Sequence, residues 1–245
     1  MAKVIPLDQI PVFGKVNVPS KDADFNAGAI FLLDKPKNWS SFDVVKFVRS
    51  RIKVKKVGHA GTLDPMATGL LVLCSGKATK SISQIQELPK TYVGEITFGT
   101  ATASYDAETD TTETADFGHI TKADIQKLLD EQFSGEIEQI PPMYSALKYG
   151  GKKLYELARK GQEVERLART ITIHKSEILD FQPPKLQLRI ECSKGTYIRS
   201  IAHDLGIALD SRAHLSALER TAIGGFSNPD ALTPHELGDI LESHG

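Results

Sequence analysis

Apolar positions recur along the chain with two different periods, which together predict both strands and helices. Uninterrupted apolar runs at Ala29–Leu33 and Leu70–Cys74 are typical of buried strands. Thr91–Phe98 alternates instead, so Tyr92 shares a face with core residues. Between the first two strands, Ser40 or Ser41 can cap a helix that has one apolar face. That face consists of Val44, Val45, Val48 and Ile52.

The second half of the chain carries both periods again. A capping-box-like sequence at Thr121 precedes an apolar stripe at helical spacing, and a short helix is predicted from Lys153 to Lys160. Three strands are predicted near Thr170–His174, Ile178–Phe181 and Leu186–Cys192. Thr196 can cap a further helix. The apolar stripe of that helix consists of Ile198, Ile201, Ala202 and Leu205.

This order of elements is neither a strict strand–helix alternation nor all strand. It favours an α+β fold with a mixed, largely antiparallel central sheet flanked by helices. Residues 1–28 carry scattered prolines and weak periodicity, and we interpret them as an N-terminal extension laid over the surface. Residues 29–230 are predicted to form one domain, with an insertion at about 100–150, and residues 231–245 a short C-terminal tail.

Charge is unevenly distributed although its sum is only −1. Five basic residues lie close together, followed later by an acidic excursion, Thr100–Gly118, that contains no lysine or arginine. We name the first group the basic cluster: Arg49, Arg51, Lys53, Lys55 and Lys56. A polyanion should approach the basic cluster, whereas the excursion must face solvent or meet something basic. The alternative interpretation of the cluster is a solvated helix end whose cations suit the helix dipole.

Composition bounds the class of protein. The chain is 40% hydrophobic and 25% charged, which is ordinary for a globular protein. No apolar run approaches the roughly 20 residues of a membrane span, and no signal-peptide core follows Met1, so we expect a soluble, cytoplasmic protein. The two cysteines, Cys74 and Cys192, have no metal-ligand spacing, so no metal is predicted.

The loop Gly58–Gly69 is the most informative segment. Its glycines allow close approach of a partner, and Pro65 restricts Asp64 to extended backbone. A carboxylate on a stiff bend before a buried strand suits a catalytic group, which needs a fixed position. The alternative is a plain Asp-Pro turn. His59, beside this loop, could contact a ligand.

A second unusual segment, Lys194–Arg199, places two cations around a predicted helix start, where the dipole disfavours them. An anion nearby, either a phosphate or a carboxylate, would stabilise them. Arg199 lies off the apolar stripe and could pair with Asp64, which would favour the ionised carboxylate. A solvent-facing arginine is the alternative. Phosphate-binding loops, dinucleotide fingerprints and serine or cysteine nucleophile motifs are absent from the sequence.

Five blocks of the chain together resemble the TruB family of tRNA pseudouridine synthases. They occur in the family's order from about residue 29 to 226. The blocks are Asp34-Lys35-Pro36 with Ser40-Ser41, the loop Gly58–Gly69, Lys90-Thr91-Tyr92, Pro141–Lys148 and Cys192–Arg199.

The resemblance implies a pseudouridine synthase fold whose active-site cleft crosses the sheet, and a cofactor-free enzyme acting on uridine 55 of the tRNA T-loop. Asp64 would be the nucleophile, Arg199 its ion-pair partner and Tyr92 the residue that stacks on the base. The substrate pocket would contain His59, Tyr197, Leu218 and Lys35. RNA-backbone contacts would come from the basic cluster (Arg49, Arg51, Lys53, Lys55 and Lys56) and from Lys148.

Further implications of the resemblance concern RNA partners and chain organisation. The acidic excursion occupies the place of the family's RNA-clamping thumb, and we expect no full C-terminal PUA domain. We expect a monomer that binds the T-arm of tRNA and no membrane. Two other functions stay open: a catalytically silent RNA-binding protein, and an N-glycosidase that releases free base. Glycosidases usually need two carboxylates, and the sequence offers one candidate.

Overall fold

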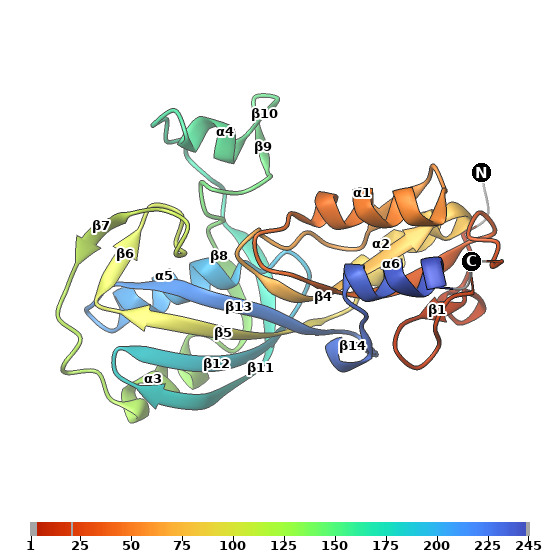
Figure 1. Ribbon diagram of the computed structural model, residues 1–245. Coiled ribbons are helices and arrows are strands. Elements are labelled where there is room, and N and C mark those ends of the chain that lie inside the picture. The colour runs from red at the N-terminus through yellow and green to blue at the C-terminus, as the bar shows by residue number, and fades with distance from the viewer. Residues whose placement is uncertain (1–3, 21, 244–245) are drawn as a thin grey trace. The chain divides into compact units, whose positions relative to one another are not determined.

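The computed structural model describes residues 4–20 and 22–243, which form two compact units (Figure 1). Unit 1 contains residues 1–92 and 219–245, and unit 2 contains residues 93–218. Two strands, β5 (Lys90–Phe98) and β13 (Ala213–Ile223), have residues in both. Among the described residues, none of the helices has the length and apolarity to cross a membrane.

Unit 1 is built on a sheet with the strand order β1-β2-β4-β13, in which β3 also pairs with β4 and β14 with β13. β2 runs antiparallel to β4, whereas β1 pairs with β2, and β13 with β4, in parallel. The strands are β1 (Val12–Phe13), β2 (Ala29–Lys35), β3 (Val57–His59), β4 (Thr68–Ser75) and β14 (Phe226–Ser227). The helices are η1 (Leu7–Gln9), α1 (Ser41–Ile52), η2 (Gly76–Ser81), α2 (Ile82–Glu87), η3 (Asn228–Asp230) and α6 (Pro234–Ser243).

The uninterrupted apolar runs of β2 and β4 arise because both faces of these strands are buried. Odd-numbered residues such as Phe31 and Leu71 join one core cluster together with the apolar face of α1 and Leu237 of α6. Even-numbered residues such as Ile30 and Leu70 join a second cluster, with Ile85 of α2. The loop after β3 is therefore attached to a sheet whose strands β2 and β4 are buried on both faces.

Helix α1 begins where the sequence predicts. Ser40 is its N-cap: the Ser40 hydroxyl accepts the backbone N–H of Asp43, and the Asp43 carboxylate accepts the N–H of Ser40, which completes a capping box. The chain leaves the helix at Lys53, whose φ of 54° is left-handed. This exit turns Lys53 and the residues after it away from the helix axis.

Unit 2 has the strand order β13-β5-β12-β11-β8, and β11 runs antiparallel to both β12 and β8. Helix α3 packs against β11 and α5. The strands are β6 (Thr100–Thr102), β7 (Thr111–Thr114), β8 (Gly135–Gln139), β9 (Lys148–Tyr149), β10 (Lys152–Lys153), β11 (Arg169–Gln182) and β12 (Lys185–Cys192). The helices are α3 (Lys122–Glu131), α4 (Leu154–Ala158) and α5 (Ile198–Ala208). The predicted mixed, largely antiparallel sheet with flanking helices is confirmed.

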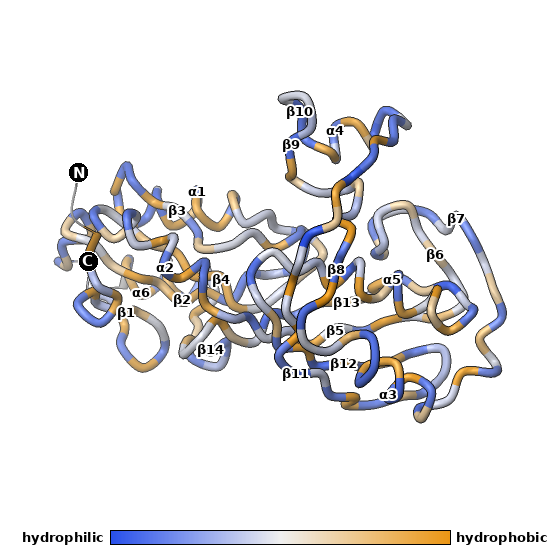
Figure 2. Tube along the Cα trace, turned by 180° about the vertical axis from the view of Figure 1, so that it is seen from behind, coloured by the Kyte–Doolittle hydropathy of each residue, from blue (hydrophilic) through white to orange (hydrophobic). Residues whose placement is uncertain are grey.

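Within unit 2, β9, β10 and α4 form a small module that stands apart from the main sheet (Figure 1). Its own apolar cluster is built on Met143, Leu154 and Leu157. The chain that leaves α4 is hydrophilic (Figure 2). We call residues 141–166 the α4 module.

Several sequence-based boundaries need correction. The strands predicted at Thr170–His174 and Ile178–Phe181 are one strand, β11, whose pairing with β12 shifts register twice and so interrupts the alternation. Thr196 does not cap α5, because its hydroxyl donates to the Ser193 carbonyl and Tyr197 is the N-cap. The helix predicted from Lys153 to Lys160 is shorter, Leu154–Ala158.

The segments expected to be an N-terminal extension and a C-terminal tail both contribute to the sheet or the core of unit 1. Within residues 1–28, β1 adds a parallel edge strand to β2, and Ile10 and Phe25 are buried in the two core clusters of unit 1. The predicted tail forms α6, which packs on α1. Residues 1–3, 21 and 244–245 lie outside the described part of the chain.

Candidate active site

Asp64 lies in the loop between β3 and β4, and hydrogen bonds hold the backbone on either side of it. The Ala67 N–H donates to the Asp64 carbonyl (3.1 Å). The buried hydroxyl of Ser41 accepts the N–H of Leu63 (2.8 Å) and donates to its carbonyl (3.1 Å). The first residue of α1 thus fixes the residue before Asp64, while the Asp64 side chain is half-buried.

Lys35 holds the other side of this loop. Its ammonium is fully buried and donates to the carbonyls of Trp39 (2.6 Å), Pro36 (3.0 Å) and Pro65 (3.3 Å). The turn before α1 and the residue after Asp64 are therefore joined through one cation. Hydrogen bonds from a charged donor are the strong kind. These contacts favour a positioning role for Lys35 over direct contact with substrate.

Replacing Lys35 by methionine tests that role. The substitution keeps the approximate length of the side chain and removes the cationic donor from three carbonyls, of which that of Pro65 keeps the Asn38 N–H (2.8 Å). We therefore expect the free energy of unfolding to fall by about 1–3 kcal/mol. Turnover should fall by about tenfold or more, with an unchanged salt dependence of RNA binding. A salt dependence that is weaker by about one phosphate contact would instead assign Lys35 to the RNA backbone.

Arg220 of β13 is a second buried cation at the Asp64 loop, and only 1% of it is exposed. Its guanidinium donates to the carbonyl of Leu70 (2.8 Å) in β4 and to that of Gly61 (3.1 Å) at the loop entrance. At the loop exit, Gly69 has a φ of 94°, and a Cβ there would lie 2.4 Å from the Arg220 carbonyl oxygen. Arg220 thus holds the Asp64 loop near both ends, through its side chain at Gly61 and through its backbone at Gly69.

His59 ends β3, at the start of the same loop. Burial, followed by the nearby Arg220 cation, lowers the pKa of His59 below its usual value. Its Nδ1 atom is buried and has no hydrogen-bond partner among the described residues. The imidazole is therefore neutral at pH 7, and it has an unused polar atom that a ligand could contact.

Tyr92 lies at the beginning of β5, and the chain entering that strand is well anchored. The buried Lys90 ammonium donates to the carbonyls of Gln86 and Leu88, the latter at 2.6 Å. The Thr221 hydroxyl donates to the Thr91 carbonyl (3.3 Å). Tyr92 itself is half-buried on the face that otherwise carries buried residues of β5. The face predicted for Tyr92 is confirmed.

Arg199, in the first turn of α5, is buried, with 4% of it exposed. Its guanidinium donates to the carbonyls of Ser104 (3.1 Å) and Tyr144 (2.9 Å) and lies 3.4 Å from a carboxylate oxygen of Asp106. Asp106 is fully buried. The alternative of a solvent-facing arginine is therefore wrong, and the carboxylate described beside Arg199 is Asp106, which sequence reasoning missed.

The acidic excursion meets basic groups at three points, which is one of the two outcomes expected from its charge. Besides the Asp106–Arg199 pair, Glu113 pairs with Arg212 (2.5 Å), and Asp116 pairs with His119 (3.4 Å). Asp106 also accepts the Ser104 hydroxyl (2.5 Å) and the Glu108 N–H (2.9 Å). These contacts hold the excursion within unit 2 at Asp106 and Glu113, whereas all four residues of β7 are exposed.

Tyr197 and Leu218 lie near Arg199 within unit 2. The Tyr197 ring centroid is 6.0 Å from the Arg199 guanidinium carbon, and Gln139 fixes the Tyr197 backbone by accepting its N–H (2.8 Å). Leu218 and Ile198, the neighbour of Tyr197, both approach the space above Gly94, where an added Cβ would lie 3.7 Å from each. Three predicted site residues are therefore gathered in one part of unit 2.

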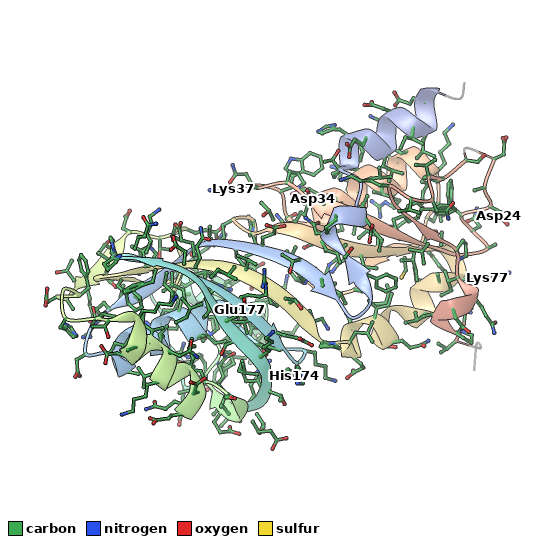
Figure 3. All side chains as sticks on the ribbon, turned by 90° about the horizontal axis from the view of Figure 1, so that it is seen from below. Asp24, Asp34, Lys37, Lys77, His174 and Glu177 are labelled. Carbon is green, nitrogen blue, oxygen red and sulfur yellow. The ribbon has the colours of Figure 1, made fainter. Side chains whose placement is uncertain are left out.

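The basic cluster contributes to a hollow of about 470 Å³ in unit 1. We name it the lysine hollow, and its lining residues are Asn26, Lys53, Lys55, Lys56, Gly76, Lys77 and Lys80. Gly76 permits the tight crossing of chain segments there, because its φ is 52° and a Cβ would lie 2.3 Å from the Asn26 carbonyl oxygen. Lys77, labelled in Figure 3, belongs to η2 of unit 1.

The two arginines of the basic cluster lie outside this lining. Arg51 pairs with Glu242 of α6 (2.7 Å) and lies over the Phe47 ring, so it joins α1 to α6. Arg49 is exposed. Lys77 and Lys80 were missed because they belong to η2, far along the sequence from α1. In the sequence they stand out only as two lysines that come shortly after the apolar run of β4.

The predicted residues divide between the two units. Asp64, His59, Lys35, Tyr92 and the basic cluster belong to unit 1, whereas Arg199, Tyr197, Leu218 and Lys148 belong to unit 2. The Asp64–Arg199 ion pair stays a prediction. Among the residues that the structure describes, no group of His, Cys, Asp or Glu side chains is placed to hold a metal ion.

Comparisons with known proteins agree over nearly the whole chain. Residues 49–198 match the family described as TruB family pseudouridylate synthase (N terminal domain), and residues 199–244 match the tRNA pseudouridylate synthase B C-terminal domain. The tRNA pseudouridine synthase B of Parabacteroides distasonis is 45% identical over 227 residues, which cover 90% of this chain and 96% of that protein. The protein of the same name from Symbiobacterium thermophilum is 49% identical over 213 residues, 86% of this chain and 71% of that one.

Solved structures show the same fold. A chain from a crystal structure of a Cbf5–Nop10–Gar1 complex has a TM-score of 0.70 and 29% identity, covering 97% of this chain and 60% of its own length. A chain from an H/ACA RNP bound to a substrate RNA containing 2'-deoxyuridine has a TM-score of 0.64 and 28% identity. The match covers 86% of this chain and 52% of that one.

Proposed function

This chain belongs to the TruB family of pseudouridine synthases, and from that premise we propose that it isomerises uridine 55 in the T-loop of tRNA to pseudouridine. The observation that carries the proposal is the clamped loop. It presents the Asp64 carboxylate from a backbone fixed by Ser41, Lys35 and Arg220. A nucleophile held in this way needs little reorganisation before it reacts.

The chemistry requires one such group. The bond between N1 of the base and the ribose breaks, the base turns, and a bond forms between C5 and the ribose. A proton leaves C5 and N1 gains one, so the reaction is neutral in atoms and electrons. A single ionised carboxylate can form the covalent intermediate that divides this process into two easier steps. We assign that role to Asp64.

The other predicted residues have roles consistent with their surroundings. Arg199 would pair with Asp64 and favour its ionised form. Tyr92 would offer a flat surface to the base once it has been flipped out of its stack. His59, which is neutral, would donate or accept one hydrogen bond, and Tyr197 and Leu218 would enclose the base. No cofactor is required by these steps.

We propose that the lysine hollow binds phosphates of the RNA. Five lysine side chains from two segments line it, and none of its lining residues within the described part of the chain is Asp or Glu. Such an arrangement attracts a polyanion without reading its sequence, so it positions the RNA and leaves recognition to the pocket. Arg49 could extend this surface, whereas the pairing of Arg51 with Glu242 favours a structural role for Arg51.

Replacing Lys53, Lys55 and Lys56 by alanine should weaken tRNA binding and flatten its salt dependence. Each lost phosphate contact lowers the slope of log K against log salt by about 0.7–0.9. Titrations at several salt concentrations measure that slope. The matched control replaces Lys122 and Lys127, two exposed lysines of α3. The control should keep the wild-type slope. If the triple variant keeps it as well, the basic cluster is only a solvated helix end.

The α4 module is a second candidate RNA contact. Lys148 is exposed on β9, beside exposed Tyr149 and a turn of two glycines, Gly150 and Gly151. Lysine cations with an exposed aromatic ring are suited to phosphate contact and base stacking. We infer that the clamping role implied for residues 100–118 belongs to this module, because the acidic excursion is occupied by its contacts within unit 2.

One assay tests the function against both alternatives. The protein is incubated with tRNA that carries tritium at C5 of uridine, and released tritium and free uracil are both measured. Isomerisation releases tritium without uracil, a glycosidase releases uracil, and a silent RNA-binding protein releases neither. Mapping the modified nucleotide then tests position 55. The monomeric state and cytoplasmic location stay predictions from the sequence.

A further inference from the structure

Tyr105 has a backbone conformation that a bulky residue rarely adopts. Its φ is 64°, in the left-handed region. Two backbone bonds hold it there: the Tyr105 N–H donates to the Thr102 carbonyl (3.2 Å), and the Leu215 N–H donates to the Tyr105 carbonyl (3.0 Å). Residues held in such conformations gather at functional sites, where the surroundings compensate for the strain. The next residue is Asp106, the partner of Arg199.

The Tyr105 ring lies flat against the imidazole of His203. The two ring centroids are 3.8 Å apart and the planes differ by 8°. His203 Nδ1 is buried and has no hydrogen-bond partner among the described residues. Burial lowers the pKa of His203, so the ring that stacks is neutral at pH 7. The contact described for the His203 ring is therefore its stacking against Tyr105.

Arg199 and His203 are four residues apart on α5 and therefore lie on one side of the helix, one turn apart. Arg199 contacts the Ser104 carbonyl and Asp106, and His203 contacts Tyr105. Three consecutive residues of the excursion are thus docked on two successive turns of one helix. Tyr105 lies between the two residues that Arg199 contacts, so the ring stack and the Arg199 contacts anchor the same short segment of chain.

We propose that Tyr105 and His203 are positioning residues, whose stack holds Asp106 against Arg199 and thereby fixes the Arg199 guanidinium for the isomerisation. The inference rests on the proposed function, since it assigns the stack a purpose in that reaction. Neither ring is required to touch the substrate. Loss of the stack should therefore lower kcat and leave RNA affinity nearly unchanged.

Four variants separate the ring from the backbone. Tyr105→Gly adopts the left-handed conformation without strain but removes the ring, and His203→Leu removes the other ring. Each should lower kcat about tenfold or more, with less than a threefold change in KM. Tyr105→Phe and His203→Phe keep two stacked rings and should retain at least half of the wild-type kcat. His174→Leu, on the exposed face of β11 (Figure 3), is the matched control and should behave as wild type.

A second measurement is independent of activity. Hydrogen exchange of the peptide containing Leu215 should accelerate in Tyr105→Gly and His203→Leu, because the Leu215 N–H donates to the Tyr105 carbonyl. Wild-type kcat in both variants would overturn the proposal, as would wild-type exchange in both. If the wild-type protein releases no tritium from labelled tRNA, the proposed function fails instead. The exchange result then still decides whether the stack holds the excursion in place.

Discussion

Asp64→Asn removes isomerisation while the protein still folds and binds tRNA. Asparagine has the shape of aspartate without its charge, so it cannot act as the nucleophile. The loop should keep its position, because the bonds from Ser41, Lys35 and Arg220 to Leu63, Pro65 and Gly61 end on main-chain atoms. The loss is therefore expected in the chemical step alone.

The expected fall in single-turnover rate is about three orders of magnitude or more. The Kd for tRNA should change by less than about tenfold, or 1.4 kcal/mol. Tritium release measures the first quantity and a binding titration the second. Asp8→Asn, an exposed acid of η1, is the control and should match wild type in both. A rate for Asp64→Asn near that of wild type would discard Asp64 as the nucleophile.

Arg199→Ala destabilises the protein as well as slowing it. Removing this guanidinium leaves the Asp106 carboxylate buried without its cation, and breaking a buried pair in this way costs about 3–5 kcal/mol. The carbonyls of Ser104 and Tyr144 also lose their donors. We expect a lower free energy of unfolding in urea at pH 7, together with a loss of turnover.

A double-mutant cycle isolates the pair. Asp106→Asn and Arg199→Met are measured singly and together, and the double variant should be more stable than the sum of the two single losses predicts. The matched cycle uses Arg189 and Glu177, an exposed pair at 2.8 Å in the same unit. Exposed pairs contribute about 0.2–1 kcal/mol. A coupling energy for Arg199 and Asp106 no larger than that of the exposed pair would remove the argument for a buried ion pair.

Much of unit 1 could be predicted from the sequence because its signals are local. The runs in β2 and β4, the capping box at Ser40 and the apolar face of α1 depend on residues a few positions apart. The Asp64 loop likewise follows from glycines and a proline within one short segment. Such features can be recognised within one segment of the sequence, and they appeared where expected.

The features that sequence reasoning missed depend on distant contacts. The strand β8 has little apolar periodicity, since only Ile137 and Gln139 are more than slightly buried, and pairing with β11 stabilises it. Asp106 meets Arg199 across about ninety positions, and Gln139 replaces the cap predicted at Thr196. A pattern limited to one segment cannot reveal which charge a buried group will find elsewhere in the chain.

Lys35 and Arg220 donate to the Pro65 and Gly61 carbonyls of the Asp64 loop, and every amino acid possesses such a carbonyl. The path of the loop is therefore largely indifferent to the identity of an exposed side chain such as Thr62. Under the proposed function, substitutions at Thr62 should therefore leave the Asp64 carboxylate in place. Evolution can in this way vary selectivity and reactivity separately within a loop of a dozen residues.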